Sequence, residues 1–348
     1  MISDHPLAHL TASRFREFLR EPEAVFWVFV FPVLLAAGLG FAFQSRPQQT
    51  IRVAVTEPAS TGSASLLSAL AAESSLIAER LDDSAAHTAL RTGRVALVVE
   101  SRPNDSVSYR YDDTRPEARA ARMLADASVQ RARGRIDPVR VADTKVRERG
   151  SRYIDFVVPG LLGMNLMGSG IWGIGFGIVT ARSRKLLKRL AATPMSRAHY
   201  LLSFLLFRLL LLVLEVGALV GFGVLVFGVP LRGSVAQLAL ICLISSLCFG
   251  AMGLLIASRA RTVEGASGLM NLAMLPMWVA SGVFFSASNF PDAVQPFIQA
   301  LPLTAVNDAL RANMLQGAGW STVLPELAVV ALWMTVSFAL ALKLFRWR

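Results

Sequence analysis

The sequence is short of the residues that form soluble surfaces, disulfide frameworks and metal sites. Charged residues make up 17% of the 348 residues and hydrophobic residues 54%, whereas a typical soluble domain has about 25% charged residues. The two cysteines, Cys242 and Cys248, lie close together in an apolar run, and the four histidines are scattered. Such cysteines indicate small buried side chains rather than a disulfide or a metal site. The composition therefore predicts a membrane protein.

The motifs of common catalytic and nucleotide-binding sites are also missing from the sequence. It contains no G-x-x-x-x-G-K-[ST] phosphate loop, no G-x-S-x-G elbow, no H-E-x-x-H and no C-x-x-C. One G-x-G-x-x-G match, at Gly168, Gly170 and Gly173, lies in an apolar run without the acid that a dinucleotide site needs about 20 residues further on. Such glycines let membrane helices approach closely, either as static packing or as a moving interface. We therefore expect no cofactor and no catalytic residue on this chain.

The net charge of +11 does not indicate a nucleic-acid-binding protein. A protein that neutralises phosphates needs a basic face, and single strands also need aromatic residues on which bases stack. Here the cations form short groups at the ends of apolar runs, without a pattern of stacking aromatics. We expect no nucleic-acid partner; the lipid bilayer is the surface that these cations fit.

Six apolar runs are long enough to cross the hydrocarbon core of a membrane, which is about 30 Å thick and needs about 20 residues of helix. They cover residues 24–43, 154–180, 201–227, 235–257, 265–285 and 323–344. The first run follows a tail with four acidic residues and precedes no clear cleavage site, so we expect an uncleaved span rather than a signal peptide.

The distribution of lysines and arginines predicts which side of the membrane faces the cytoplasm. The N-terminal tail, the loop after the second run, the loop after the fourth run and the C-terminal tail have three, six, two and three of them. The short loops on the opposite side have only Arg232 and Arg311. Because short cytoplasmic loops are enriched in these residues, we expect both termini to be cytoplasmic.

The expected fold class is therefore an α-helical polytopic membrane protein with six transmembrane helices and a small α/β extracytoplasmic domain between helices 1 and 2. Residues 1–23 would form an amphipathic cytoplasmic helix, 24–43 the first span, 44–152 the α/β domain and 153–348 the other five spans. Within the α/β domain the patterns predict strands at 51–57, 94–100 and 106–113 and helices at 64–73, 83–93 and 114–134.

Two ionisable residues lie deep in the third run. If that helix enters the membrane near residue 201, Arg208 lies about 10 Å and Glu215 about 21 Å along it, on the same face. A charge at this depth is costly, and usually faces protein or water and has a partner. One interpretation is that Arg208 extends to the cytoplasmic surface while Glu215 is protonated or bonded to a neighbour. The other places both residues in a translocation pathway.

The loop at 181–200, between the second and third runs, has an amphipathic pattern. Leu186, Leu187 and Leu190 share one helical face, and the lysines and arginines occupy the other. Pro194 would end this helix and permit a turn back into the bilayer. Binding to anionic lipid explains why cations are present there, but not why this loop has six when the loop after the fourth run has two.

Four segments together resemble the type-2 permeases of ATP-binding cassette (ABC) transporters. They are REPEAVFWVFVFPVLLAAGLG at the first span, IRVAVTE at the start of the polar domain, KRLAATPMSRAHYLLSFLLFR in the cytoplasmic loop, and LPLTAVNDALRANMLQG before the last span. The resemblance covers essentially the whole chain. Each segment is moderately specific alone, and their order within a six-helix plan is more specific.

The resemblance implies a permease subunit of an ATP-driven exporter in a bacterial cytoplasmic (inner) membrane. Its partners would be separate ABC ATPase subunits and a second permease, identical or homologous, with which it forms the translocation pathway. Residues at or near the ATPase-coupling contact would be Arg184, Lys185, Lys188, Arg189, Leu190, Thr193 and Pro194. Residues 286–320 would dip into the outer leaflet as short broken helices. Glu215 departs from the family pattern, so the resemblance gives it no role.

Two other functions remain open from the sequence. An ion- or proton-coupled secondary transporter needs several membrane-embedded acids or histidines, and only one acid, Glu215, lies at mid-depth. A membrane-anchored sensor could use the extracytoplasmic domain to bind a ligand, but needs a cytoplasmic output domain, for which the two tails are short. The size and position of the outer domain also suggest a periplasmic adaptor as a further partner.

Overall fold

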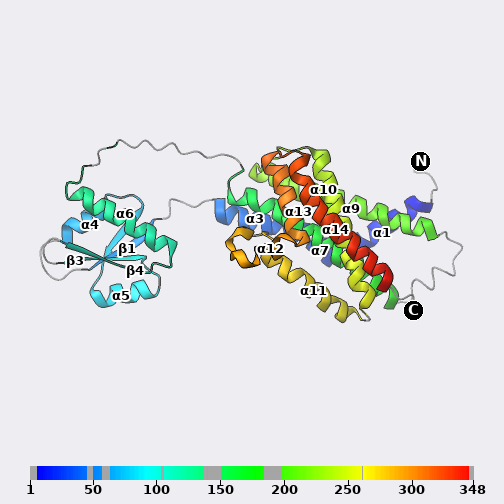
Figure 1. Ribbon diagram of the computed structural model, residues 1–348, viewed down its shortest axis with the longest axis horizontal. Helices are drawn as coiled ribbons and strands as arrows, with labels where there is room; N and C mark the ends of the chain where they lie inside the picture. The colour runs from blue at the N-terminus through cyan, green and yellow to red at the C-terminus, as the bar shows by residue number, and fades with distance from the viewer. Residues whose placement is uncertain are drawn as a thin grey trace. The chain divides into compact units, whose positions relative to one another are not determined.

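A computed structural model describes residues 6–44, 50–56, 63–102, 106–136, 139, 150–183, 197–260 and 262–344. The chain divides into two compact units, one formed by Met1–Gln44 with Arg147–Arg348 and the other by Ser45–Val146 (Figure 1). The smaller unit lies within residues 44–152, the range in which a separate domain was expected. The side of the membrane on which that domain lies stays a prediction.

The larger unit is helical. Its helices are α1 (Pro6–Leu19), α2 (Pro22–Val25), α3 (Phe31–Gln44), α7 (Tyr153–Ser183), α9 (Arg197–Phe227), α10 (Val235–Arg259), α11 (Val263–Ala280), α12 (Gln295–Gln299), α13 (Pro302–Arg311) and α14 (Trp320–Leu344). Five segments in the described part of the chain are long and apolar enough to cross a membrane: Pro22–Phe43, Tyr153–Thr180, Leu206–Phe227, Val235–Arg259 and Trp320–Leu344. These correspond to five of the six expected spans.

The remaining expected span, residues 265–285, corresponds to the shorter helix α11. It ends at Ala280, because the chain turns at Gly282, whose φ of 71° lies in the left-handed region that favours glycine. Eighteen residues of helix extend about 27 Å, and Glu264 and Asn271 lower the apolar character of this helix. Whether α11 crosses the membrane stays a prediction, and so does the count of six.

Helix α7 lies at the centre of the larger unit. Of its apolar window 89% is buried, compared with 28% for α9 and 22% for α14. Glycines permit a close contact with α10. A Cβ on Gly170 would lie 2.7 Å from Cβ of Phe249, and one on Gly253 would lie 2.7 Å from the carbonyl oxygen of Ile171. A Cβ on Gly173 or Gly177 would meet no atom within 4 Å. The contact with α10 therefore involves Gly170 and Gly253 rather than Gly173 or Gly177.

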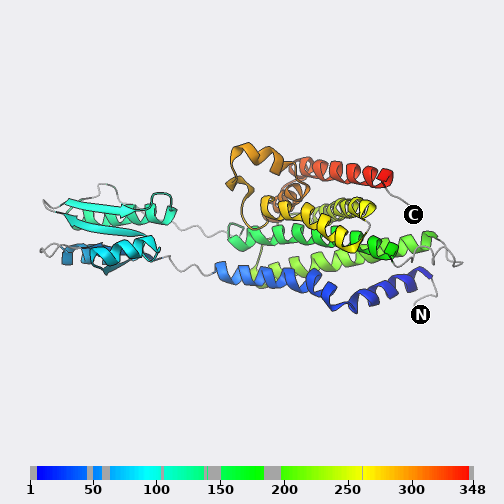
Figure 2. The same ribbon diagram turned by 90° about the horizontal axis from the view of Figure 1, so that it is seen from below.

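The first span is not a regular α-helix. A π-helical turn, η1 (Phe26–Val30), lies between α2 and α3, and α1 runs at an angle to α3 beyond it (Figure 2). Pro32 follows two residues after the turn. Proline has no amide hydrogen and its ring disturbs the preceding helical turn, so it commonly marks a kink in a helix.

The segment before the last span forms short helices, as expected for residues 286–320. It contains η2 (Ala287–Asn289), η3 (Asp292–Val294), α12, α13 and a second π-helical turn, η4 (Ala312–Gln316). Helix α13 is almost wholly buried and packs against α7 and α14. The depth of this segment in the membrane stays a prediction.

The smaller unit is an α/β domain. Its four-stranded sheet has the order β2 (Leu76–Arg80), β1 (Ile51–Thr56), β3 (Leu97–Arg102), β4 (Ser106–Tyr111). Strand β1 is parallel to β2 and β3, and β4 is antiparallel to β3. Helices α4 (Ser63–Ala71) and α6 (Pro116–Ala132) cover one face and α5 (Asp83–Arg91) the other (Figure 1).

Candidate functional site

A buried ion pair joins three helices inside the larger unit. On α9, Nη1 of Arg208 lies 3.4 Å from Oε1 of Glu215. On α7, the Ser169 hydroxyl donates to Oε2 of Glu215 at 2.9 Å and accepts from Nη2 of Arg208 at 2.9 Å. On α10, Oγ of Ser246 accepts from Nε and Nη2 of Arg208 at 3.3 and 3.2 Å. We call these four residues the buried polar cluster.

The seven-residue spacing of Arg208 and Glu215 explains how the cluster forms. Seven residues are close to two helical turns, so both side chains lie on the face of α9 that packs against α7 and α10. The Arg208 guanidinium bonds inward, with its side chain 16% exposed, and Glu215 is 1% exposed. The expectation that the two residues share a face is met. Arg208 bonds to the cluster rather than extending to the membrane surface, and Glu215 has the partners that a buried acid needs.

The buried polar cluster has no net charge when both ionisable groups are charged. Each carboxylate oxygen of Glu215 accepts a hydrogen bond, and the two serine hydroxyls come from the neighbouring helices. A buried pair of this kind is tolerated because its hydrogen bonds offset the cost of removing charges from water. The cluster connects α9, whose span is little buried, to the buried helix α7 through hydrogen bonds to Ser169.

The seven predicted ATPase-coupling residues, Arg184, Lys185, Lys188, Arg189, Leu190, Thr193 and Pro194, lie outside the described residues. The helices on either side are described: α7 continues to Ser183 and α9 begins at Arg197, within the loop expected at 181–200. At the end of α7, Arg182 donates to the carbonyl oxygens of Ala257 and Ala260 at 3.2 and 3.4 Å. These bonds attach the start of the loop to α10.

A second buried arginine lies at the opposite end of α7 and was missed by the sequence analysis, which used Arg311 only as a charge in a loop. Its guanidinium carbon lies 3.7 Å from the centroid of the Phe156 ring. It donates to the carbonyl oxygens of Gly282 and Phe156, and Asp308 lies 3.6 Å from Nη1. Arg311 therefore joins α13 to α7 and to the turn after α11. The strongly amphipathic pattern of α13, the helix that contains Arg311, was the sequence signal that could have identified this residue.

Asp155 forms the connection between α7 and the chain that returns from the smaller unit. Its side chain is completely buried and accepts hydrogen bonds from the amides of Gly150 and Arg152 at 2.9 and 3.1 Å. The Arg152 guanidinium also donates to Asp155, at 2.9 and 2.7 Å, and to the carbonyl of Gly228 at 3.2 Å. An acid near a helix N-terminus stabilises free amides and interacts favourably with the helix dipole.

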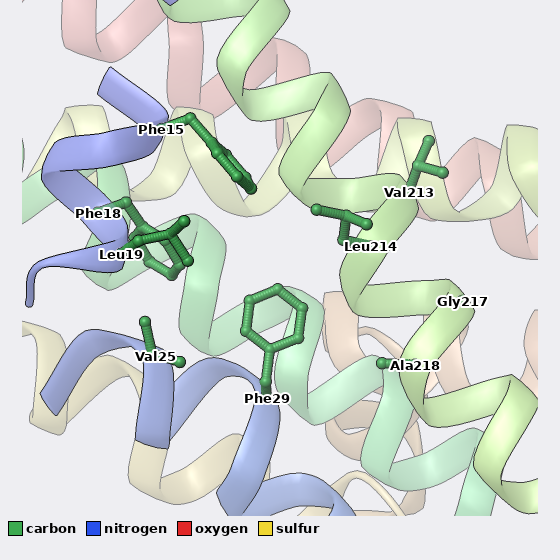
Figure 3. A pocket seen from close by; sticks show the side chains of 9 residues that line it. All are labelled: Phe15, Phe18, Leu19, Val25, Phe29, Val213, Leu214, Gly217 and Ala218. Atoms are coloured by element: carbon green, nitrogen blue, oxygen red, sulfur yellow. The ribbon is translucent and has the colours of Figure 1, made fainter. Parts of the chain in front are cut away.

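An open apolar pocket of about 430 Å³ is lined by residues of α1, α2, η1 and α9. Figure 3 shows side chains of α1, α2 and η1 on one side and of α9 on the other, with the Phe29 ring between them. The lining residues are Phe15, Phe18, Leu19, Val25, Phe29, Val213, Leu214, Gly217 and Ala218. The lining has no ionisable side chain. In the part of the chain that the structure describes, no three His, Cys, Asp or Glu residues gather as metal ligands do.

The sequence was compared with protein families and with curated proteins. The model of the family described as "ABC-2 family transporter protein" matches residues 23–343. The chain is 24% identical to ABC transporter G family member 20 of Dictyostelium discoideum over 58% of its own length and 28% of the relative's. It is 27% identical to the inner membrane transport permease YhhJ of Escherichia coli over 35% of its own length and 32% of the relative's.

Each of these two alignments therefore spans about a third or less of the relative's length. The family match, by contrast, runs from the start of the first span almost to the end of the last helix. It includes the buried polar cluster, the loop at residues 181–200 and the smaller unit. With its apolar helices, the match shows that this chain belongs to the ABC-2 family of transporter proteins.

Proposed function

We propose that this membrane component of an ABC transporter is the permease subunit of an exporter that is driven by ATP bound to other chains. The observation that supports this most directly is the combination of a family match over residues 23–343 with the lack of a phosphate loop in these 348 residues. A transporter subunit of this composition provides a pathway through the membrane, and a separate ATPase subunit provides the energy.

The proposed assembly contains two permeases, identical or homologous, and two ATPase subunits on the cytoplasmic side of a bacterial inner membrane. The cationic loop at 181–200 supports this orientation, because short cytoplasmic loops are rich in Lys and Arg. The smaller unit would face the periplasm, where an adaptor protein could bind it. Arg208 and Glu215 would border the pathway, since relative movement of α9 and α7 must separate or reorganise their contacts.

Purification of the permease with its native partners tests this function. We expect an ABC ATPase subunit to co-purify, with an ATP hydrolysis rate that candidate substrates increase. The matched control is the same complex with an inactive ATPase subunit, which should neither hydrolyse ATP nor transport. Reproducible absence of an ATPase from the purified complex would contradict the proposal. It would favour an ion-coupled transporter or a sensor.

The cytoplasmic loop gives a second prediction. Reversing the charges of Lys188 and Arg189 to Glu should uncouple ATP hydrolysis from transport, because these cations would then repel an acidic surface on the ATPase. The measurement is the ratio of substrate molecules transported to ATP molecules hydrolysed in proteoliposomes. Arg346 and Arg348, replaced together by Glu, provide a control with the same change in charge in the C-terminal tail. An unchanged ratio in the Lys188 and Arg189 variant, with altered membrane topology, would instead assign these cations to lipid.

A further inference from the structure

The π-helical turn in the first span leaves one backbone acceptor without its ordinary partner. In an α-helix the carbonyl of Val28 would accept from the amide four residues later. That residue is Pro32, which has no amide hydrogen. The helix widens into the π-helical turn η1 just before this proline. In a lipid environment a carbonyl without a donor costs several kcal/mol, so a donor from a neighbouring helix stabilises the chain at this position.

Asn165 of α7 supplies that donor. Its Nδ2 lies 3.2 Å from the carbonyl oxygen of Val28, and its side chain is 7% exposed. An asparagine amide buried in a membrane helix is itself unfavourable unless it forms hydrogen bonds. The contact therefore satisfies two polar groups at once. It also connects the break in the first span directly to the most buried helix of the unit.

The break separates two parts of the chain that are held in different ways. On one side, α3 packs against α7. On the other side, α1 contacts α9 through the bond from Nε of Arg14 to Oγ of Ser203, at 3.2 Å, and through Phe18, whose ring lies 6.0 Å from that of Phe207. The open apolar pocket of about 430 Å³ lies beside the break, where Phe18, Val25 and Phe29 line it (Figure 3). A helix beside a cavity can change its angle with less repacking than a helix in a close-packed core.

We propose that Asn165 is a positioning residue for a hinge at η1, which sets the angle between the surface helix α1 and the first span. When α1 moves, the Asn165 contact holds the α3 side of the hinge against α7, so that movement bends the chain at η1 rather than displacing the span. The role of the hinge, which is to transmit motion of the ATPase, rests on the proposed function. The hinge itself is formed by residues of the permease alone.

The test measures the hinge in the purified permease without an ATPase. Spin labels are placed on two exposed residues, through Arg16→Cys on α1 and Arg259→Cys on α10, after Cys242 and Cys248 are changed to Ser. Distance distributions are recorded in lipid nanodiscs by pulsed electron paramagnetic resonance. We expect Asn165→Leu, which keeps the branch at Cγ but has no amide donor, to broaden the distribution and shift its mean. The control is Asn271→Leu on the exposed face of α11, which should leave the distribution unchanged.

A second substitution keeps the result interpretable. Pro32→Ala restores an amide that can donate to the Val28 carbonyl, so the first span no longer needs Asn165. The double variant Pro32→Ala/Asn165→Leu should therefore recover a narrow distribution, a non-additive result typical of residues that act on one group. An unchanged distribution in Asn165→Leu, or one that stays equally broad in the double variant, would overturn the proposal. The distances do not depend on transport, so the hinge and the proposed function can fail separately.

Discussion

Changing Glu215 to Gln should abolish transport and destabilise the purified permease by about 3 kcal/mol, the low end of the cost of breaking a buried ion pair. The neutral amide can still accept a hydrogen bond, but it leaves the buried Arg208 guanidinium without a counter-charge. Loss of the charge also weakens the hydrogen bond from Ser169 of α7 to residue 215 of α9, because that bond no longer ends on a carboxylate. We expect insertion into the membrane to be unaffected, because the substitution makes α9 less charged.

Two variants identify the cause of this loss. The control Glu264→Gln removes an exposed acid at the start of α11, and it should change neither stability nor transport. The double variant Arg208→Met/Glu215→Met replaces the whole pair by apolar side chains and should recover most of the stability. Thermal unfolding in detergent and transport by proteoliposomes are the two measurements. If Glu215→Gln retains normal transport, the pathway role is wrong. If the double variant recovers transport with stability, the pair only holds the helices together.

Changing Arg311 to Lys should destabilise the permease almost as much as Glu215→Gln does, although the positive charge is kept. The guanidinium stacks on the Phe156 ring while it donates to the carbonyls of Gly282 and Phe156. A lysine ammonium lacks the planar fork and cannot make these contacts together. Each buried carbonyl left without a donor costs about 1–3 kcal/mol. We expect a lower unfolding temperature and easier proteolysis in residues 281–317, measured by limited digestion in detergent.

The matched control for Arg311 is its acidic neighbour. Asp308 has a half-exposed side chain, and an exposed ion pair contributes at most about 1 kcal/mol. Asp308→Asn should therefore leave the unfolding temperature and the digestion pattern nearly unchanged. Equal effects of Arg311→Lys and Asp308→Asn would show that the ion pair, and not the stacking and carbonyl contacts, holds α13 in place.

The apolar runs and the division into two units were predictable from the sequence, because both depend on properties that are local along the chain. Five expected spans match described helices, and the polar region between the first two folds separately. The strand at Leu76–Arg80 was missed. It is short, its Ile77 is exposed and it ends in two charged residues, so it lacks the alternation that identifies a half-buried strand.

The contacts that define the candidate site were only partly predictable. The face shared by Arg208 and Glu215 follows from helical spacing, and the need for partners follows from their depth. Ser169 and Ser246 could not be chosen from the many serines, because they become partners only when three helices pack together. Arg311 was missed for a similar reason. Its carbonyl partners belong to the backbones of Phe156 and Gly282, which have no recognisable side-chain signature.

The contact between Asn165 and Val28 also has a consequence for biosynthesis. The two residues are 137 positions apart in the sequence, and the smaller unit lies between them. At a synthesis rate of about 5–20 residues per second, Asn165 follows Val28 out of the ribosome on the order of 10 s later. During that interval the first span is in the membrane without its α7 partner. A chain arrested before residue 165 would therefore lack the donor that the Val28 carbonyl has in the finished permease.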